Sequence, residues 1–186
     1  SMRRVGYVSS SGNGSSAGTL HGAQQFWTGN VSGLGGFFYV ARFGSASSLS
    51  TQRIFVGMYA STSVIGNVNP STLVNVLGFG LDSGDTNFTF MHNDGVGTAI
   101  KDALTGNISG ITANTDMYEI RIFCAPNGTT IYYSIENLSN PSYHSGSATS
   151  DIPSNTTLLS PQIWINNGGT GAVGIDVVSQ YIETDY

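Results

Sequence analysis

Residues 117–138 read MYEIRIFCAPNGTTIYYSIENL and carry the clearest structural pattern in this chain. In the first half of the stretch the apolar residues occupy even positions: Tyr118, Ile120, Ile122 and Cys124. Glu119 and Arg121 lie at the odd positions between them. In the second half the apolar residues occupy odd positions: Ile131, Tyr133 and Ile135. Apolar and polar residues that alternate with a period of two are typical of half-buried β-strands, so strands are predicted over 117–124 and 129–138.

The segment between these strands, Ala125–Gly128, contains the turn-forming residues Pro, Asn and Gly. We therefore expect an antiparallel hairpin. The predicted register is: Ile122 with Ile131, Ile120 with Tyr133, and Tyr118 with Ile135. It places both apolar rows on one face and sets Arg121 opposite Tyr132 on the other. A slip of one residue would bury Glu119 and Arg121, which fixes the buried face.

Short apolar runs separated by turn residues continue along the chain. Further strands are predicted at 3–8, 24–29, 36–43, 53–60, 73–82, 87–92, 97–104, 158–166 and 171–182. A short helical turn is predicted from Asn69 and Pro70 into 71–75. The Ser/Gly-rich segments 9–18 and 44–51 read as loops.

Three of the predicted strands, 36–43, 53–60 and 171–182, are apolar on both faces. We expect such strands to lie under a second layer or at a subunit contact. Many short strands with at most one short helix predict an all-β fold, an antiparallel β-sandwich of the jelly-roll type. The predicted domain spans 1–186, with 1–20 as a partly flexible N-terminal lead-in.

The composition of the chain argues against several classes of protein. Of the 186 residues only 9% are charged and 39% are hydrophobic, and 25 are glycine. The net charge of −5 and six scattered basic residues argue against nucleic-acid binding. No apolar run has the length of a membrane span, so membrane insertion is not expected. A single cysteine argues against a disulfide framework.

Catalytic patterns are not found in the sequence. Glycoside hydrolysis uses two carboxylates held close together, whereas Glu119 and Glu136 lie on separate predicted strands and Glu183 directly follows a third. No Gly-x-Ser-x-Gly motif precedes a helix. We therefore expect a protein that is not an enzyme and that needs no cofactor. Asp82 and Asp85 offer oxygen ligands for calcium, but their spacing is also ordinary for a turn.

Candidate ligand-binding residues lie where strands run into loops. His92, Asn93 and Asp94 combine three polar side chains at a strand end, and Tyr143 and His144 follow a proline in another loop. Aromatic rings can stack on sugar rings, and amide, carboxylate and imidazole groups can bind sugar hydroxyls. The alternative for His92–Asp94 is that these residues only close a hairpin.

A family resemblance rests on the order and spacing of several segments along nearly the whole chain. They are GLGGFFYVARF (33–43), RIFVGMYASTS (53–63), NPSTLVNVLGFGLDSGDTNFTFMHNDGVGTA (69–99), DMYEIRIFCAPNGTTIYYSIE (116–136), LLSPQIWINNG (158–168) and DVVSQYIETDY (176–186). The chain resembles the C-terminal domains of bacteriophage and prophage tail-fibre and tail-spike proteins. The resemblance implies a concanavalin-A-like jelly roll that forms a homotrimer at the tip of a fibre of the virion.

The implied function is receptor binding outside the cell, during host adsorption. The receptor would be a host surface polysaccharide or an outer-membrane component, and the family supplies no binding residues. Two alternatives stay open: a structural, trimerising fibre module that binds nothing, and a glycan depolymerase.

Overall fold

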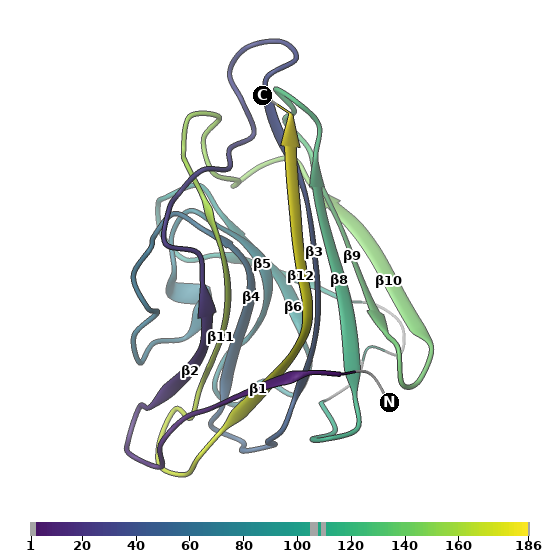
Figure 1. Cartoon of the computed structure of the whole chain (residues 1–186). Coiled ribbons are helices and arrows are strands. Elements are labelled where there is room, and N and C mark those ends of the chain that lie inside the picture. Colours follow the sequence, from purple (N-terminus) through teal and green to yellow (C-terminus); the bar gives the residue numbers. More distant parts are fainter. Residues whose placement is uncertain (1–2, 105–107, 109–110, 186) are drawn as a thin grey trace.

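The computed structural model describes residues 3–104, 108 and 111–185, and these form two six-stranded antiparallel sheets packed face to face (Figure 1). In sheet A the strands follow the order β1-β12-β3-β8-β9-β10, and in sheet B the order β2-β11-β4-β5-β6-β7. The predicted all-β, antiparallel sandwich is therefore confirmed. The strands of sheet A are β1 (Val5–Val8), β12 (Gly174–Asp185), β3 (Gly35–Ser45), β8 (Met117–Cys124), β9 (Ile131–Asn137) and β10 (Ser142–Ala148). Those of sheet B are β2 (Ser16–Leu20), β11 (Ser160–Asn166), β4 (Arg53–Tyr59), β5 (Val76–Leu81), β6 (Thr89–Asn93) and β7 (Ile100–Ala103).

Two strands were not predicted, and one predicted strand is absent. β2 and β10 consist mainly of small and polar residues, so they carry no apolar alternation. Both are edge strands that gain their hydrogen bonds from a neighbour. Both β1 and β2 lie within residues 1–20, and each pairs with one of the two sheets. The predicted strand 24–29 contributes one isolated bridge, between Phe26 and Leu159.

The predicted helical turn is a single 3-10 turn, η1 (Pro70–Thr72). Asn69 precedes it but does not cap it through its side chain. Instead Asn69 Oδ1 accepts hydrogen bonds from Arg53 Nε at 2.6 Å and from the backbone N–H of Ser83 at 3.2 Å. Among the described residues, no helical segment has the length and hydropathy that crossing a membrane would require.

The β8–β9 hairpin has the predicted faces but a different register. Ile122 pairs with Tyr133, Ile120 with Ile135 and Cys124 with Ile131. The predicted pairs were wrong by two residues, because the connection runs from Ala125 to Thr130 and not only over Ala125–Gly128. A shift by two keeps every side chain on its face, so the apolar rows still point inward.

The core lies between the sheets and is built from alternate residues of the central strands. Sheet A contributes large side chains that are almost fully buried: Phe37, Tyr39, Phe43, Tyr118, Ile120, Ile122 and Ile135. Sheet B contributes the facing set: Ile54, Val56, Met58, Leu77, Phe79, Phe90, Ile163 and Ile165. Burial of these side chains is the main contribution to the stability of the sandwich.

A second apolar cluster covers the outer face of sheet B. Its buried members come from the sheet, from the segment 60–75 that follows β4 and from the β6–β7 connection: Phe55, Ile65, Leu73, Val76, Met91, Ala99 and Trp164. The strand predicted at 53–60 is apolar on both faces for this reason, since its outer face is covered by the same chain. A subunit contact is not needed to explain that pattern.

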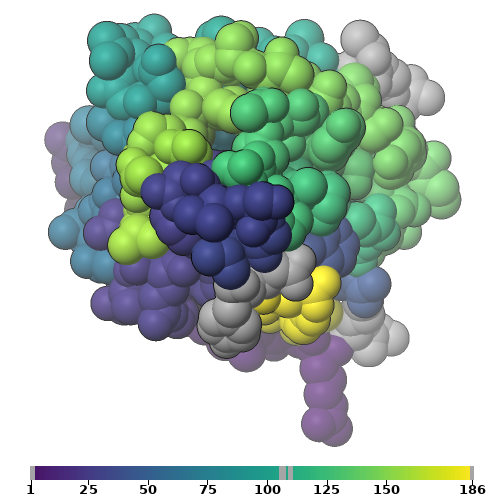
Figure 2. Space-filling view, turned by 90° about the horizontal axis from the view of Figure 1, so that it is seen from above, coloured from purple at the N-terminus to yellow at the C-terminus, as the bar shows by residue number. Residues whose placement is uncertain are grey.

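Loops gather at one end of the sandwich, which Figure 2 shows from above. The dark-blue loop before β3 lies against the green loop that follows β8. Thr28 O accepts hydrogen bonds from the backbone N–H groups of Gly36 at 3.0 Å and Asn127 at 2.8 Å. Gly29 has a φ of +95°, and a Cβ there would lie 2.0 Å from Leu34 O. A glycine is therefore required where these loops meet.

Replacement of Ile120 by Ala tests the assignment of faces. Ile120 is fully buried between the sheets, so Ile120→Ala should lower the free energy of unfolding by about 2–5 kcal/mol. Phe123→Ala, on the outer face of the same strand, removes a larger side chain that is 42% exposed and should cost less. Urea denaturation of both variants measures the difference. A larger loss for Phe123→Ala would contradict the assignment.

Candidate functional site

The outer face of sheet A remains open to solvent, in contrast to the outer face of sheet B. Four exposed aromatic side chains lie on it: Phe123 is 42% exposed, Tyr132 53%, Tyr143 56% and Tyr181 53%. Every exposed phenylalanine and tyrosine in the described part of the chain lies on this one face. Exposed apolar surface concentrated in one place usually marks an interaction site.

Side chains on this face form three rows that run across the strands. The first row holds three aromatic rings: Glu183, Phe38, Phe123, Tyr132 and Ser147. The second row has an arginine at its centre, followed by two serines: Tyr181, Val40, Arg121, Ser134 and Ser145. The third row is mostly charged: Ser179, Arg42, Glu119, Glu136 and Tyr143. Antiparallel pairing brings these residues together from five strands.

A groove of about 420 Å³ is hollowed between the first two rows. Its aromatic lining consists of Phe38, Phe123, Tyr132, Tyr133 and Tyr143. Its polar lining comes from Arg121 and from serines of β9 and β10: Ser134, Ser145 and Ser147. The ring centroids of Phe123 and Tyr132 lie 6.3 Å apart, and those of Phe38 and Phe123 lie 6.5 Å apart. The volume is within the usual range of small-ligand sites, about 300–1,000 Å³.

Ion pairs fix the charged groups beside the groove. Glu119 is only 3% exposed, although it lies on the outer face. Its carboxylate accepts hydrogen bonds from Arg42 Nε and from a terminal nitrogen of Arg121. The same Arg121 nitrogen lies 3.9 Å from Glu136 Oε2. Glu119 and Glu136 are cross-strand neighbours, and Arg121 offsets the repulsion between them.

Of the predicted ligand-binding residues, Tyr143 lies in the groove. His144 follows it in β10 and therefore points to the opposite face, where its ring stacks on Tyr133 with centroids 6.3 Å apart. His92 is 3% exposed, and its Nδ1 lies 3.0 Å from the backbone oxygen of Asp151. His92 Nε2 lies 3.5 Å from Asp102 Oδ2, which also accepts a hydrogen bond from the Tyr133 hydroxyl at 3.0 Å.

Asn93 and Asp94 bind their own turn. Asn93 is fully buried, and its side chain donates to Val96 O at 2.8 Å and accepts from the backbone N–H of Gly95 at 2.7 Å. Asp94 Oδ1 accepts from the backbone N–H of Val96 at 3.1 Å. These bonds correspond to the hairpin-closing alternative. The five predicted residues therefore do not form one surface, and the Phe38, Arg121, Phe123 and Tyr132 side chains were missed.

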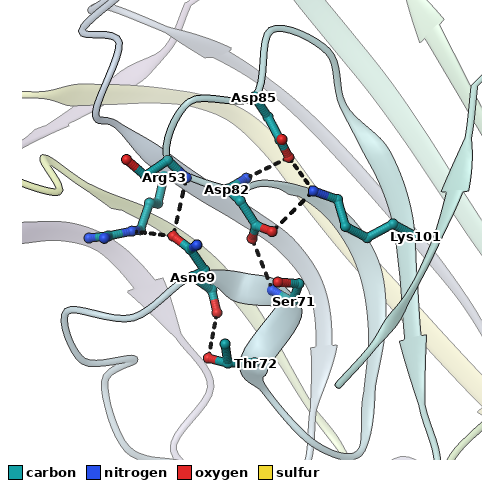
Figure 3. Close-up of polar contacts among 8 residues, drawn as sticks. Arg53, Asn69, Ser71, Thr72, Asp82, Asp85 and Lys101 are labelled. Atoms are coloured by element: carbon teal, nitrogen blue, oxygen red, sulfur yellow. Dashed lines mark hydrogen bonds and ion pairs between the residues drawn. The ribbon is translucent and has the colours of Figure 1, made fainter. Parts of the chain in front are cut away.

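The proposed calcium ligands Asp82 and Asp85 are drawn in Figure 3. Lys101 Nζ lies 3.0 Å from Asp82 Oδ2 and 2.5 Å from Asp85 Oδ2. Asp82 Oδ1 accepts a hydrogen bond from the backbone N–H of Ser71 at 3.0 Å. The Lys101 ammonium group already binds both carboxylates and offsets one of their two negative charges. In the part of the chain that is described, no group of three or more His, Cys, Asp and Glu side chains could hold a metal ion.

Comparisons with known proteins identify the fold but no family. No protein-family model matches the sequence, and no curated protein matches it. Arcelin-5, a lectin-like defence protein from Phaseolus vulgaris, has a TM-score of 0.60 at 8% identity over 94% of this chain and 81% of its own. The lectin UEA-II complexed with galactose has a TM-score of 0.60 at 12% identity, with 98% and 86% coverage. Alginate lyase A1-II', of polysaccharide lyase family 7, has 0.51 at 11%, with 92% and 71% coverage. The chain thus has the legume-lectin-like jelly roll that the resemblance implied.

Removal of the Lys101 charge should weaken the attachment of η1 to sheet B. Burial opposes the charge of Lys101, but hydrogen bonds to Asp85 and Asp82 raise its pKa above the ordinary value of 10.5. Lys101→Met should cost about 0.5–1 kcal/mol of unfolding free energy at pH 7, because Asp82 and Asp85 lose their counter-ion and solvent screens the pair in part. A group whose pKa is higher in the folded than in the unfolded protein stabilises the fold at pH values below its unfolded-state pKa. The difference between the variant and the wild type should therefore shrink as the pH rises above about 10.5.

Urea denaturation at a series of pH values measures this difference. Asp94→Asn is the matched control, since it removes a charge from an exposed turn and keeps the oxygen that accepts from Val96. Equal stability of Lys101→Met and the control at pH 7 would show that the cluster contributes nothing.

Proposed function

We propose that this protein is a carbohydrate-binding domain without catalytic activity, and that its glycan binds in the groove on the outer face of sheet A. The observation that carries the proposal is the concentration of all the exposed phenylalanine and tyrosine rings of the described residues on this face. Rings lie beside serine hydroxyls and a guanidinium group in a hollow large enough for a small ligand.

This combination suits the chemistry of sugars. A pyranose ring has an apolar face of C–H groups, which can stack on Phe123 or Tyr132, and a rim of hydroxyls. The hydroxyls can accept from Arg121 and exchange hydrogen bonds with serines. Small-ligand sites usually combine apolar contact with a few polar groups that fix orientation. The lectin relatives of the fold, one of them complexed with galactose, add support from analogy of fold.

The composition of the face favours a glycan over a second copy of the chain. Stable subunit interfaces are enriched in apolar side chains and depleted of charge at their centre. Here Arg42, Glu119 and Arg121 lie in the middle of the sheet, and the surface is hollow. The absence of catalysis is part of the proposal. It is supported by Glu119, whose carboxylate is occupied by two guanidinium groups and is poorly placed to deliver a proton.

The biological setting is taken from the resemblance to phage tail fibres. In this proposal the domain lies at the fibre tip of a virion, acts outside the cell, and binds a host surface polysaccharide or outer-membrane component. Three copies bind together. A single site of millimolar affinity is worth only about −4 kcal/mol. Tethering three such sites can raise avidity by roughly 100-fold or more, so a shallow groove is sufficient.

Removal of groove aromatics should abolish glycan binding without unfolding the protein. Tyr132→Ala and Tyr143→Ala each remove an exposed ring, and we expect a loss of about tenfold or more in affinity on a glycan array. The control is Val96→Ala, because Val96 is 77% exposed in the β6–β7 turn of the other sheet. Wild-type protein that binds no glycan and no host cell would instead support a purely structural module. Cleavage of a bound polysaccharide would support the depolymerase alternative.

Assembly is tested separately. Analytical ultracentrifugation at micromolar concentration should show a trimer. A trimer that persists in Tyr132→Ala and Tyr143→Ala would place the subunit contacts away from the groove. A monomer at all concentrations would contradict the trimeric part of the proposal and leave the glycan site standing.

A further inference from the structure

We infer that the groove selects uncharged glycans and discriminates against glycans that carry carboxylate or phosphate groups. This inference rests on the proposed function, because it specifies the ligand class of the same site. It follows from how the charged side chains beside the groove are paired.

The two arginines of the face are already committed to an internal partner. Glu119 lies between Arg42 and Arg121 and accepts hydrogen bonds from both. Because Glu119 is only 3% exposed, its charge would lose one of its two counter-ions if a ligand carboxylate drew either guanidinium away. A buried carboxylate that loses a hydrogen-bonded counter-ion cannot replace it with water, so this loss is unfavourable. An anionic sugar therefore cannot use these arginines as free cations.

The remaining charges around the groove are negative. Glu136 Oε2 lies 3.9 Å from Arg121, and Glu183, at the end of the aromatic row, accepts a hydrogen bond from the Tyr181 hydroxyl at 2.5 Å. Two guanidinium groups thus face three carboxylates, on a chain whose net charge is −5. A ligand that carries negative charge would be repelled as it approaches.

The same pairing suits hydroxyl groups. A guanidinium has five N–H donors in a plane, and only some of those of Arg121 are used by Glu119. Its other donors are held in a fixed direction beside Ser134, its cross-strand partner. Neutral hydroxyls can use these donors without disturbing Glu119. The ion pairs therefore hold the donors of Arg121 in place for hydroxyl groups, and they leave little net attraction for a negatively charged ligand.

The first experiment compares matched neutral and anionic ligands. Wild-type protein is tested on an array of neutral glycans and of their uronate-containing counterparts, and the best neutral glycan is then titrated beside its C6-carboxylate derivative. We expect binding of the neutral glycan to change less than about twofold between roughly 20 mM and 200 mM salt. The carboxylated derivative should bind at least about fivefold more weakly at low salt.

Preference for the carboxylated derivative, lost in high salt, would overturn the inference and leave the proposed function standing. Binding to no glycan of either kind would overturn the proposed function and the inference together. The two failures are thus distinguishable.

The second experiment releases the arginines. Glu119→Gln removes the buried carboxylate charge. We expect the affinity of this variant for the carboxylated derivative to be about fivefold higher than that of the wild type at low salt, and to fall back to the wild-type affinity at about 1 M salt. Glu183→Gln is the control, because it removes one negative charge without freeing a guanidinium, and its gain should stay below about twofold.

Since Glu119 is buried and structural, Glu136→Gln is a second variant at a more exposed position of the same network. It should show a smaller gain in the same direction. Equal affinity of Glu119→Gln, Glu136→Gln and Glu183→Gln for the carboxylated derivative would overturn the inference.

Discussion

The alternation of side chains across the β8–β9 hairpin determines both the core of the sandwich and the outer face of sheet A. Each residue of these strands faces either the core or the solvent, and the pattern allows one choice. Ile120 and Ile122 close the core, and Glu119 and Arg121 are carried to the outer face by the same backbone. The hydrophobic effect that stabilises the sandwich therefore also places the charged side chains beside the groove. Neither face can be changed by a one-residue slip without loss of the other.

The two sheets differ in what covers them, and this difference locates the candidate site. Sheet B is closed on its outer side by the segment after β4, where Ile65 and Leu73 pack on Phe55 and its neighbours. Sheet A has no comparable apolar cluster outside among the described residues, and its rings remain exposed. Because a jelly roll needs only its inner faces for folding, the outer face of sheet A is free to carry function.

The sequence predicts which face of each strand is buried better than it predicts which residues pair across strands. An apolar period of two fixes which side is buried, so the two-layer sandwich and the core of β8 and β9 could be foreseen. The register error of two residues had no effect on the core, yet it set Tyr132 opposite Arg121 in place of Phe123. Because of that error, the predicted register did not bring Phe123 and Tyr132 together in one row. β10 was missed because its serines and glycine carry no apolar pattern, and without it His144 could not be separated from Tyr143.

The burial of Glu119 has a further consequence for weak binding. A long arginine side chain that becomes ordered when a ligand binds loses conformational entropy, typically about 0.5–1.5 kcal/mol per side chain. Arg42 and Arg121 are held by Glu119 before any ligand arrives. The rings of Tyr132 and Phe123 have few rotatable bonds and lie against each other. A site prepared in this way can use a small contact area efficiently, because the cost of ordering is met during folding. In the proposed trimer, three such faces would raise the avidity of a weak single site.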